Sequence, residues 1–223
     1  MVDRLRFEPL DPSQGPVGVD GLGDYRGAIE LRPSAGGVAV VNDVALDDYL
    51  RGISEVPSNW PPAALEAQAI AARTYALYQL AQAVPTAATA VGAQICATDA
   101  CQVYAGLAKE RAPNGADWSA AVDRTAGQAV LDRGQPILAM YSSSNGGRSV
   151  AGSKPYLRVV DDPDDARSPL SKWRTTVAFN DLQGAFSLPG PVTGLTRTGD
   201  SIDIAYNHKR CIIGGIKILI PGT

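Results

Sequence analysis

One carboxyl group in this chain, that of Glu55, is a candidate for general acid–base catalysis. Glu55 lies between two predicted helices, and Val56, Pro57 and Trp60 are the apolar residues available to surround it. A carboxyl group in such surroundings can keep its proton near neutral pH and give it to a departing oxygen. Taken by itself, a lone glutamate before a proline is more typical of a solvated carboxylate or of a cap near a helix start.

A polar loop follows directly on a predicted strand. The strand ends at Tyr141, and residues 142–149 read Ser-Ser-Ser-Asn-Gly-Gly-Arg-Ser. An exposed loop presented by a rigid strand is an arrangement in which proteins often place binding groups. On composition alone, a plain turn without a ligand is the slightly better interpretation.

Three cysteines bear on the compartment and on metal binding. Cys96 and Cys101 bracket a four-residue loop that could close as a disulfide in an oxidising compartment, whereas Cys211 would remain unpaired. Two reduced, half-buried thiols account for the same spacing equally well. His208 is the only imidazole, and the pattern is not a recognised four-ligand zinc spacing, so we expect neither a metal nor another cofactor.

The overall composition limits the kinds of partner. The 223-residue chain has a net charge of −3 and a pI of about 5.2, so it lacks the positive field that a nucleic-acid backbone demands. No stretch approaches the roughly 20 apolar residues of a membrane span, and residues 1–4 open without the apolar run of a signal peptide. We therefore expect a soluble chain that binds no nucleic acid.

A long helix is the element expected to position these residues. Residues 58–62 supply cap residues and first-turn prolines, an Ala-rich stretch follows to about Ala83, and Pro85 ends it. Its small side chains predict close approach to a neighbouring element, so we expect the helix to be central. One stripe of the helix is formed by Leu65, Ala69, Ala72, Ala76 and Leu80.

Antiparallel hairpins and shorter helices are predicted around that helix, which indicates an α+β fold. We divide the chain into a loose leader at 1–24 with one short strand near Val17–Val19, a main domain at 25–190, and a strand-rich end at 191–223. In the last part, the β-branched residues of 212–220 favour a closing strand. The other elements are a hairpin at 28–31 and 38–41, helices at 43–52 and 118–125, and a second hairpin at 128–131 and 136–141.

Five separated segments carry a family resemblance. They are residues 41–50 with Glu55-Val56-Pro57 after them, residues 64–77, residues 101–106, residues 141–148 and residues 155–161. In this order they resemble the SpoIID/LytB domain, the family of stage II sporulation protein D and of the amidase enhancers of bacterial cell walls. Five segments in one order are much harder to reach by chance than one motif. The resemblance covers about residues 25–190, and Ala-Arg-Thr-Tyr-Ala at residues 72–76 is its most specific piece.

The resemblance implies an activity and a set of site residues. Stage II sporulation protein D is a lytic transglycosylase that cuts peptide-stripped glycan strands, and other members enhance a cell-wall amidase. By position the catalytic acid is Glu55. The implied substrate contacts are Arg73, Tyr141, Ser143, Ser144, Gly146 and Gly147. On its residue type alone, Arg73 is a surface cation or an ion-pair partner, for instance of Glu66.

The chemistry implied for Glu55 needs one carboxyl group. In a lytic transglycosylase the same group protonates the departing glycosidic oxygen and then takes a proton from the muramyl 6-hydroxyl, which closes a 1,6-anhydro ring. Ordinary glycoside hydrolysis usually needs two carboxyl groups across the bond. The implied partners are peptidoglycan glycan strands and a cell-wall amidase, and the implied location is extracytoplasmic. The rival interpretation is a non-catalytic glycan-binding module that stimulates an amidase.

The sequence also departs from the family at two places. The family often carries a histidine before its serine and glycine loop, and some members place a metal near that region, whereas the equivalent stretch here is Met140-Tyr141-Ser142-Ser143. The C-terminus from residue 207 onward lacks the Arg-rich, Leu-Gly-Leu-like strand that commonly ends the domain. The first departure agrees with the expected absence of a metal site, and the second indicates a truncated or altered end.

Overall fold

The computed structural model describes residues 4–11, 15–82, 88–171, 178–185, 191–198, 201–206 and 209–211. The chain forms two compact units, Met1–Tyr141 and Ser142–Thr223, and the predicted domain boundaries after residues 24 and 190 remain a prediction. Helices and antiparallel sheets occur together, which confirms the predicted α+β class.

The first hairpin is confirmed. Strands β4 (Ala28–Ser34) and β5 (Gly37–Asp43) pair in register from one end to the other, and the turn lies at the predicted glycines. Strand β1 (Leu5–Phe7) adds to the free edge of β4, so the sheet order is β1-β4-β5. Strands β2 (Val17–Val19) and β3 (Gly23–Tyr25) form a separate hairpin.

The predicted loose leader is more ordered than expected because of a buried charge. Glu30 in β4 is only 2% exposed. Its carboxylate accepts hydrogen bonds from the guanidinium groups of Arg4, Arg6 and Arg32. Arg32 and Arg6 lower the pKa of Glu30, because their hydrogen bonds favour the charged carboxylate. Two of these arginines belong to the leader, which the carboxylate thus ties to the sheet.

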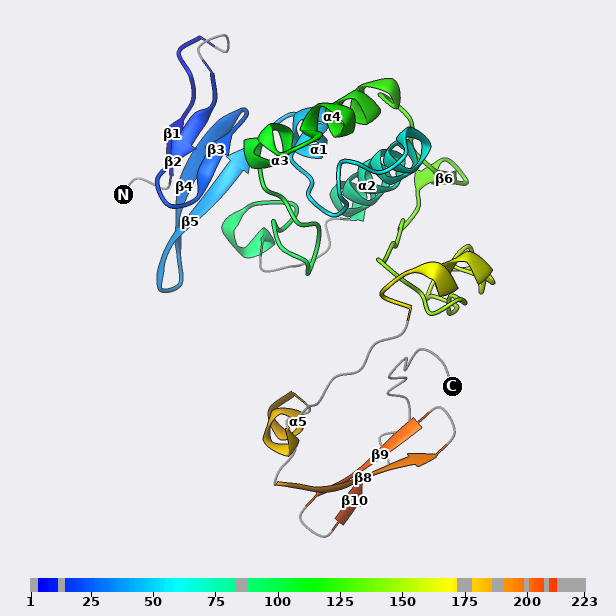
Figure 1. Cartoon of the computed structure of the whole chain (residues 1–223). Coiled ribbons are helices and arrows are strands. Elements are labelled where there is room, and N and C mark those ends of the chain that lie inside the picture. The colour runs from blue at the N-terminus through cyan, green and yellow to red at the C-terminus, as the bar shows by residue number, and fades with distance from the viewer. Residues whose placement is uncertain are drawn as a thin grey trace. The chain divides into compact units, whose positions relative to one another are not determined.

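The long helix is confirmed as the centre of the first unit. Helix α2 (Pro62–Gln82) contacts α1 (Leu46–Arg51) and α4 (Gly115–Arg124), and α3 (Leu107–Arg111) packs on α1 and α4 (Figure 1). Pro85, the predicted stop, lies outside the described residues. The predicted stripe forms much of the core except for Leu80, which is 48% exposed. The buried members of the core are Tyr49, Leu50, Ile53, Leu65, Ala69, Ala72, Ala76, Trp118, Ala121 and Val122.

Arg73 of α2 is a framework residue. Its side chain is 2% exposed, and its guanidinium donates to the carbonyl oxygens of Val122 and Thr125 at 3.1 and 2.8 Å. These carbonyls belong to the C-terminal end of α4, where a helix has no partners of its own for its last oxygens. Further hydrogen bonds join Arg73 to Asp47 and to the Gln128 carbonyl. The structure thus gives Arg73 a structural role, and its predicted contact with substrate remains a prediction.

The second hairpin is much shorter than predicted. It consists of β6 (Leu131–Asp132) and β7 (Gln135–Pro136). Its two turn residues, Arg133 and Gly134, both have positive φ, which suits the right-handed twist of a two-residue hairpin turn. A 3-10 helix, η2 (Thr89–Val91), completes the regular elements of the first unit.

The second unit contains a 3-10 helix, η3 (Pro163–Arg167), a short helix, α5 (Phe179–Ala185), and a three-stranded antiparallel sheet. The sheet has the order β10-β9-β8, with β8 at Val192–Thr198, β9 at Ser201–Tyr206 and β10 at Lys209–Cys211. The predicted strand-rich end is thus strand-rich, and the predicted strand within 212–220 lies outside the described residues. Among the described helices, none has the length and apolar character needed to cross a membrane.

The role of Arg73 predicts a large loss of stability when its charge is removed. Arg73→Met leaves buried carbonyl oxygens of α4 without donors, so the free energy of unfolding should fall by about 3–5 kcal/mol. Arg124→Met is the control, because Arg124 pairs with Glu66 on the surface, and such pairs contribute less than about 1 kcal/mol. Urea denaturation followed by circular dichroism measures both, and equal losses would contradict the assignment.

Candidate functional site

A short antiparallel pairing brings two distant segments together in the first unit. The amide of Ser54 donates to the carbonyl oxygen of Val103, and the amide of Ala105 donates to that of Gly52, both at 2.8 Å. Ile53 and Tyr104 form the bridge between these bonds. The pairing fixes the backbone immediately before Glu55 against the backbone that follows the cysteine loop.

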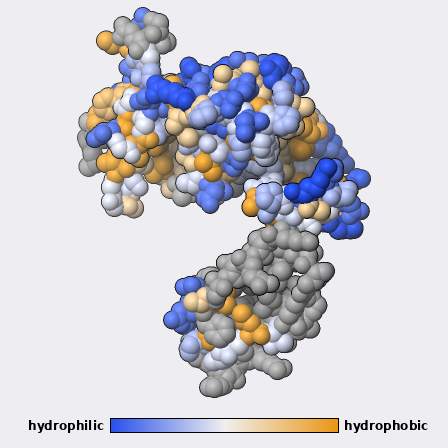
Figure 2. All heavy atoms as spheres, viewed as in Figure 1, coloured by the Kyte–Doolittle hydropathy of each residue, from blue (hydrophilic) through white to orange (hydrophobic). Residues whose placement is uncertain are grey.

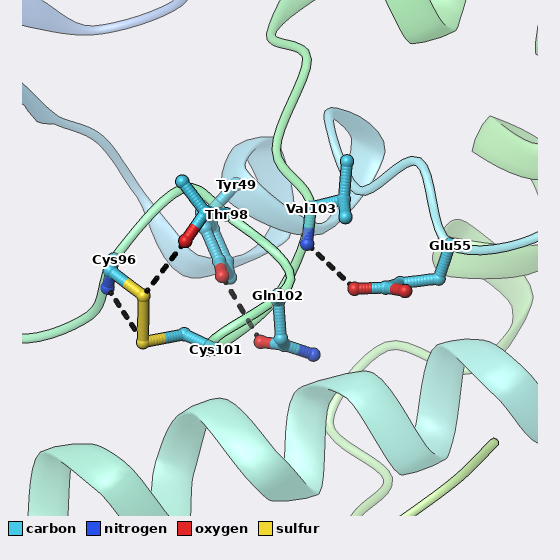
Figure 3. The surroundings of a disulfide bond; sticks show 7 residues. All are labelled: Tyr49, Glu55, Cys96, Thr98, Cys101, Gln102 and Val103. Carbon is cyan, nitrogen blue, oxygen red and sulfur yellow. Dashed lines mark hydrogen bonds between the residues drawn. A yellow bond between two sulfur atoms is a disulfide. The ribbon is translucent and has the colours of Figure 1, made fainter. Parts of the chain in front are cut away.

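Glu55, the predicted catalytic acid, is held from both sides. Its side chain is half-buried, and its Oε1 accepts a hydrogen bond of 2.6 Å from the amide of Val103 (Figure 3). The next residue, Val56, is held through its carbonyl oxygen by the ammonium group of Lys109. The carboxylate therefore has one oxygen fixed by a backbone donor, and its main chain is anchored on either side.

Lys109 is an unusual anchor because it is buried. It is 5% exposed, and its ammonium nitrogen lies 5.5 Å from the centroid of the Trp118 ring. Burial lowers the pKa of Lys109, since it disfavours the charged form. Of the apolar neighbours predicted for Glu55, Val56 packs against the core, whereas Trp60 remains 42% exposed.

A buried glutamine links the cysteine loop to a second predicted site residue. Gln102 is fully buried, and its Oε1 accepts a hydrogen bond from the hydroxyl of Tyr49 at 3.1 Å. Its Nε2 donates to the carbonyl oxygen of Ala72 at 3.3 Å and to the hydroxyl oxygen of Tyr141 at 2.9 Å. Tyr141 is thus tied to α2 and to α1 through one amide.

Tyr141 and Glu55 are hydrogen bonded to two successive residues, Gln102 and Val103. Burial raises the pKa of Tyr141 to about 12, the hydrogen bond from Gln102 opposes this, and the nearby charge of Glu55 adds to it. Burial also raises the pKa of Tyr49, with smaller contributions from Tyr141 and Glu55. Both phenols therefore remain protonated at neutral pH.

The predicted disulfide is present. Cys96 and Cys101 are bonded with a Cα–Cα separation of 5.5 Å, and the amide of Cys96 also donates to the sulfur of Cys101 (Figure 3). Within the closed loop, the carbonyl oxygen of Ala97 accepts from the amide of Tyr104. The loop ends immediately before the two residues that hold Tyr141 and Glu55, so the disulfide restrains the backbone that positions them.

The polar loop belongs to the second unit and is organised by acidic side chains. The carboxylate of Asp165 accepts from the Ser144 hydroxyl at 2.7 Å and from the Gly147 amide at 3.0 Å. Asn145 donates to Asp162 at 3.0 Å. Ser143 and Gly146 are exposed, and Gly146 and Gly147 adopt positive φ. The loop is therefore an ordered turn, and its predicted contact with glycan remains a prediction.

Sequence reasoning missed Gln102, Val103 and Lys109 as positioning residues. Gln102-Val103 lies in one of the resembling segments, but its partners are 30 or more residues away and no local period reveals them. A long polar side chain directly after a disulfide loop is the signal that could have found Gln102. Tyr104 is a packing residue, as its type suggests, because its ring stacks on Tyr49 with centroids 5.1 Å apart.

A cavity of about 670 Å³ lies elsewhere on the first unit. Its walls come from β4, β5, the end of α2 and the segment from η2 to the disulfide, and Glu55 is not among its lining residues. Apolar residues gather on the surface over this sheet (Figure 2), among them Phe7, Val38 and Val40. We place the candidate site at Glu55 and Tyr141 because the convergent polar groups are there. Among the described residues, no cluster of His, Cys, Asp and Glu could hold a metal ion.

Comparisons with known proteins match the part of the chain that contains Glu55 and Gln102. Residues 34–131 match the SpoIID family, described as stage II sporulation protein. The chain is 31% identical over 184 residues to stage II sporulation protein D of Bacillus subtilis, which covers 76% of this chain and 53% of that protein. It is 33% identical over 141 residues to the amidase enhancer of the same organism, with 60% of this chain and 17% of that protein covered. An uncharacterised protein of Brachyspira hyodysenteriae is 30% identical over 169 residues, which is 71% of this chain and 43% of that protein. The chain thus spans only part of each relative.

The position of the disulfide predicts a coupled effect on stability and on local order. Replacing Cys96 and Cys101 with serine releases a six-residue loop, which should lower the free energy of unfolding by about 2 kcal/mol. Hydrogen exchange at the amide of Val103 should accelerate, because the strand it belongs to loses its restraint. Wild type in reducing agent should match the double variant, and the variant itself should not respond to the reductant. Unchanged exchange at Val103 would contradict the positioning role.

The environment of Tyr141 predicts a dependence of stability on pH. Its pKa is raised from 10.0 to about 12, so between these values the unfolded chain loses the proton first. The resulting contribution to stability is complete below pH 10 and is lost as the pH rises towards 12. Tyr141→Phe should therefore show a shallower decline of the denaturation midpoint over this range than wild type. Parallel declines would show that the phenol is not held in its neutral form.

Proposed function

Because the chain belongs to the SpoIID/LytB family through residues 34–131, we propose that it acts on the bacterial cell wall as a lytic transglycosylase. Its substrate would be peptidoglycan glycan strands stripped of their peptides, and its product strands with 1,6-anhydro-muramyl ends. Glu55 is the catalytic residue, and Tyr141 binds substrate beside it. The observation that carries the proposal is that successive residues, Val103 and Gln102, hold the carboxyl group of Glu55 and the hydroxyl of Tyr141.

The geometry at Glu55 suits a reaction with one carboxyl group. The amide of Val103 occupies Oε1, so the transferable proton belongs on Oε2. From there it passes to the glycosidic oxygen as the bond to the anomeric carbon breaks. The resulting carboxylate takes the proton of the muramyl 6-hydroxyl, whose oxygen closes the ring on the anomeric carbon. Glu55 ends the cycle protonated, and no water molecule is consumed.

The disulfide supports the proposed location. Disulfides persist in oxidising environments such as the cell surface and are rare where thiols are kept reduced. The bond between Cys96 and Cys101, beside the site, therefore favours an extracytoplasmic location, in the cell wall or secreted. Ser143, Ser144, Gly146 and Gly147 of the polar loop are the further candidates for glycan contact.

A second candidate function is glycan binding without catalysis. The relative named amidase enhancer favours it, since that name describes stimulation of another enzyme. In this case the chain would bind glycan strands through the same residues and recruit a cell-wall amidase as partner. It would then require Tyr141 and the polar loop, but not the proton of Glu55.

Digestion of peptide-stripped sacculi separates the two candidates. Wild type should release anhydro-muropeptides detectable by mass spectrometry, and Glu55→Gln should lower their rate of release by roughly a hundredfold or more, because it removes the general acid. Glu66→Gln is the matched control, since Glu66 pairs with Arg124 on the surface. It should retain the wild-type rate.

Three outcomes distinguish the proposals. Equal release by wild type and Glu55→Gln would remove Glu55 from the mechanism. No release by either, together with retention of both on sacculi in a pull-down, would favour the binding module. Neither release nor retention would exclude both functions.

A further inference from the structure

Gln102 is a fully buried polar residue whose side chain reaches Tyr141. We infer that Gln102 is a positioning residue that commits Tyr141 to donating its hydroxyl proton to an oxygen of the bound N-acetylated glycan. The inference deepens the proposed function and rests on it for the identity of the ligand. It concerns the direction of one chain of hydrogen bonds, which runs from Tyr49 through Gln102 to Tyr141.

The orientation of the Gln102 amide is fixed by an acceptor. A backbone carbonyl oxygen has no proton to give, so the group that faces the carbonyl of Ala72 must be the amide nitrogen. The amide oxygen is then on the opposite side, where the hydroxyl of Tyr49 lies 3.1 Å away. Reversing the amide would place two oxygens against each other at Ala72, inside the core, at a cost of a buried unpaired group.

This orientation determines the role of the Tyr141 hydroxyl. The second hydrogen of the amide nitrogen points to the oxygen of Tyr141, which therefore accepts. A phenol that accepts from one neighbour has its own proton directed away from that neighbour. Because Tyr141 is half-buried and stays protonated at neutral pH, its hydroxyl is a donor for a ligand.

A glycan strand offers the matching groups. Acetamido carbonyl oxygens and glycosidic oxygens only accept hydrogen bonds. The Tyr141 hydroxyl, which can only donate to the ligand, therefore binds them in preference to the N–H or O–H groups of the sugar. The position of Glu55 adds to this, because successive residues, Gln102 and Val103, hold Tyr141 and Glu55, so the phenol can also hold the sugar oxygen that receives the proton of Glu55. Tyr141 would thus orient the N-acetyl sugar whose bond is cleaved.

A double-variant cycle tests whether Gln102 acts through Tyr141. Gln102→Met keeps the length of the side chain and removes the donor, and Tyr141→Phe removes the hydroxyl. Each should lower kcat on stripped glycan strands by roughly tenfold to a hundredfold, the range expected for one hydrogen bond made in the transition state. The variant with both changes should be no slower than Tyr141→Phe. Val122→Ala, a buried change elsewhere in the core, controls for loss of stability and should keep the wild-type kcat.

A second measurement does not depend on catalysis. Tyr141 is replaced with 3,5-difluorotyrosine, whose phenol ionises at lower pH, and its titration is followed by fluorine NMR. Loss of a donor to the phenol oxygen destabilises the phenolate, so Gln102→Met should raise the pKa of this residue. If Tyr141 donated to Gln102 instead, the same change would lower it. Val122→Ala should leave it unchanged.

The outcomes separate this inference from the proposed function. The role of Gln102 would be overturned if the losses of kcat in the two single variants multiplied in the double variant. It would also be overturned if the pKa at position 141 fell or stayed constant in Gln102→Met. If wild type releases no product, the proposed catalysis fails, and the fluorine titration alone decides the direction of the hydrogen bonds. A non-additive cycle together with a raised pKa would establish Gln102 as the residue that orients Tyr141.

Discussion

The antiparallel pairing of residues 52–54 with residues 103–105 is the contact on which the site depends. It contains only a few backbone hydrogen bonds, yet it joins the end of the α1 segment to the end of the disulfide loop. On one strand the next residue is Glu55, and on the other the preceding residue is Gln102. A shift of this register by one residue would turn both side chains to the opposite face. The disulfide and the buried ammonium of Lys109 restrain the backbone at either end of the pairing.

The rest of the first unit supports that pairing through α2. The helix presents alanines to the core, which lets α1 and α4 pack closely against it, and its one buried cation binds the last carbonyl oxygens of α4. The carbonyl of Ala72 on the same helix fixes the direction of the Gln102 amide. Helix α2 thus holds the framework through the side chain of Arg73 and orients Gln102 through the carbonyl oxygen of Ala72. Arg73 and Ala72 are adjacent in the chain.

Features that local pattern determines could be predicted from the sequence. The hairpin of β4 and β5 and the helix α2 each follow from signals within a few residues, whereas the spacing of Cys96 and Cys101 left a disulfide and two reduced thiols equally open. The sequence did not predict the ordered structure of the leader or the roles of Arg73 and Gln102. Most of their partners are distant in sequence, and the interactions are between polar groups. Glu30 gathers arginines from two strands, and Arg73 reaches residues about 50 positions away. The family resemblance predicted a substrate contact for both Arg73 and Tyr141. Only the structure shows that Arg73 is buried and Tyr141 half-buried.

The most direct measurement is a crystal structure of the Glu55→Gln variant with a tetrasaccharide of peptide-stripped glycan bound. We expect a glycosidic oxygen next to the amide at position 55 and an acceptor oxygen of the same sugar on the hydroxyl of Tyr141. A tetrasaccharide seated instead in the 670 Å³ cavity beside β5, with position 55 and Tyr141 untouched, would contradict it.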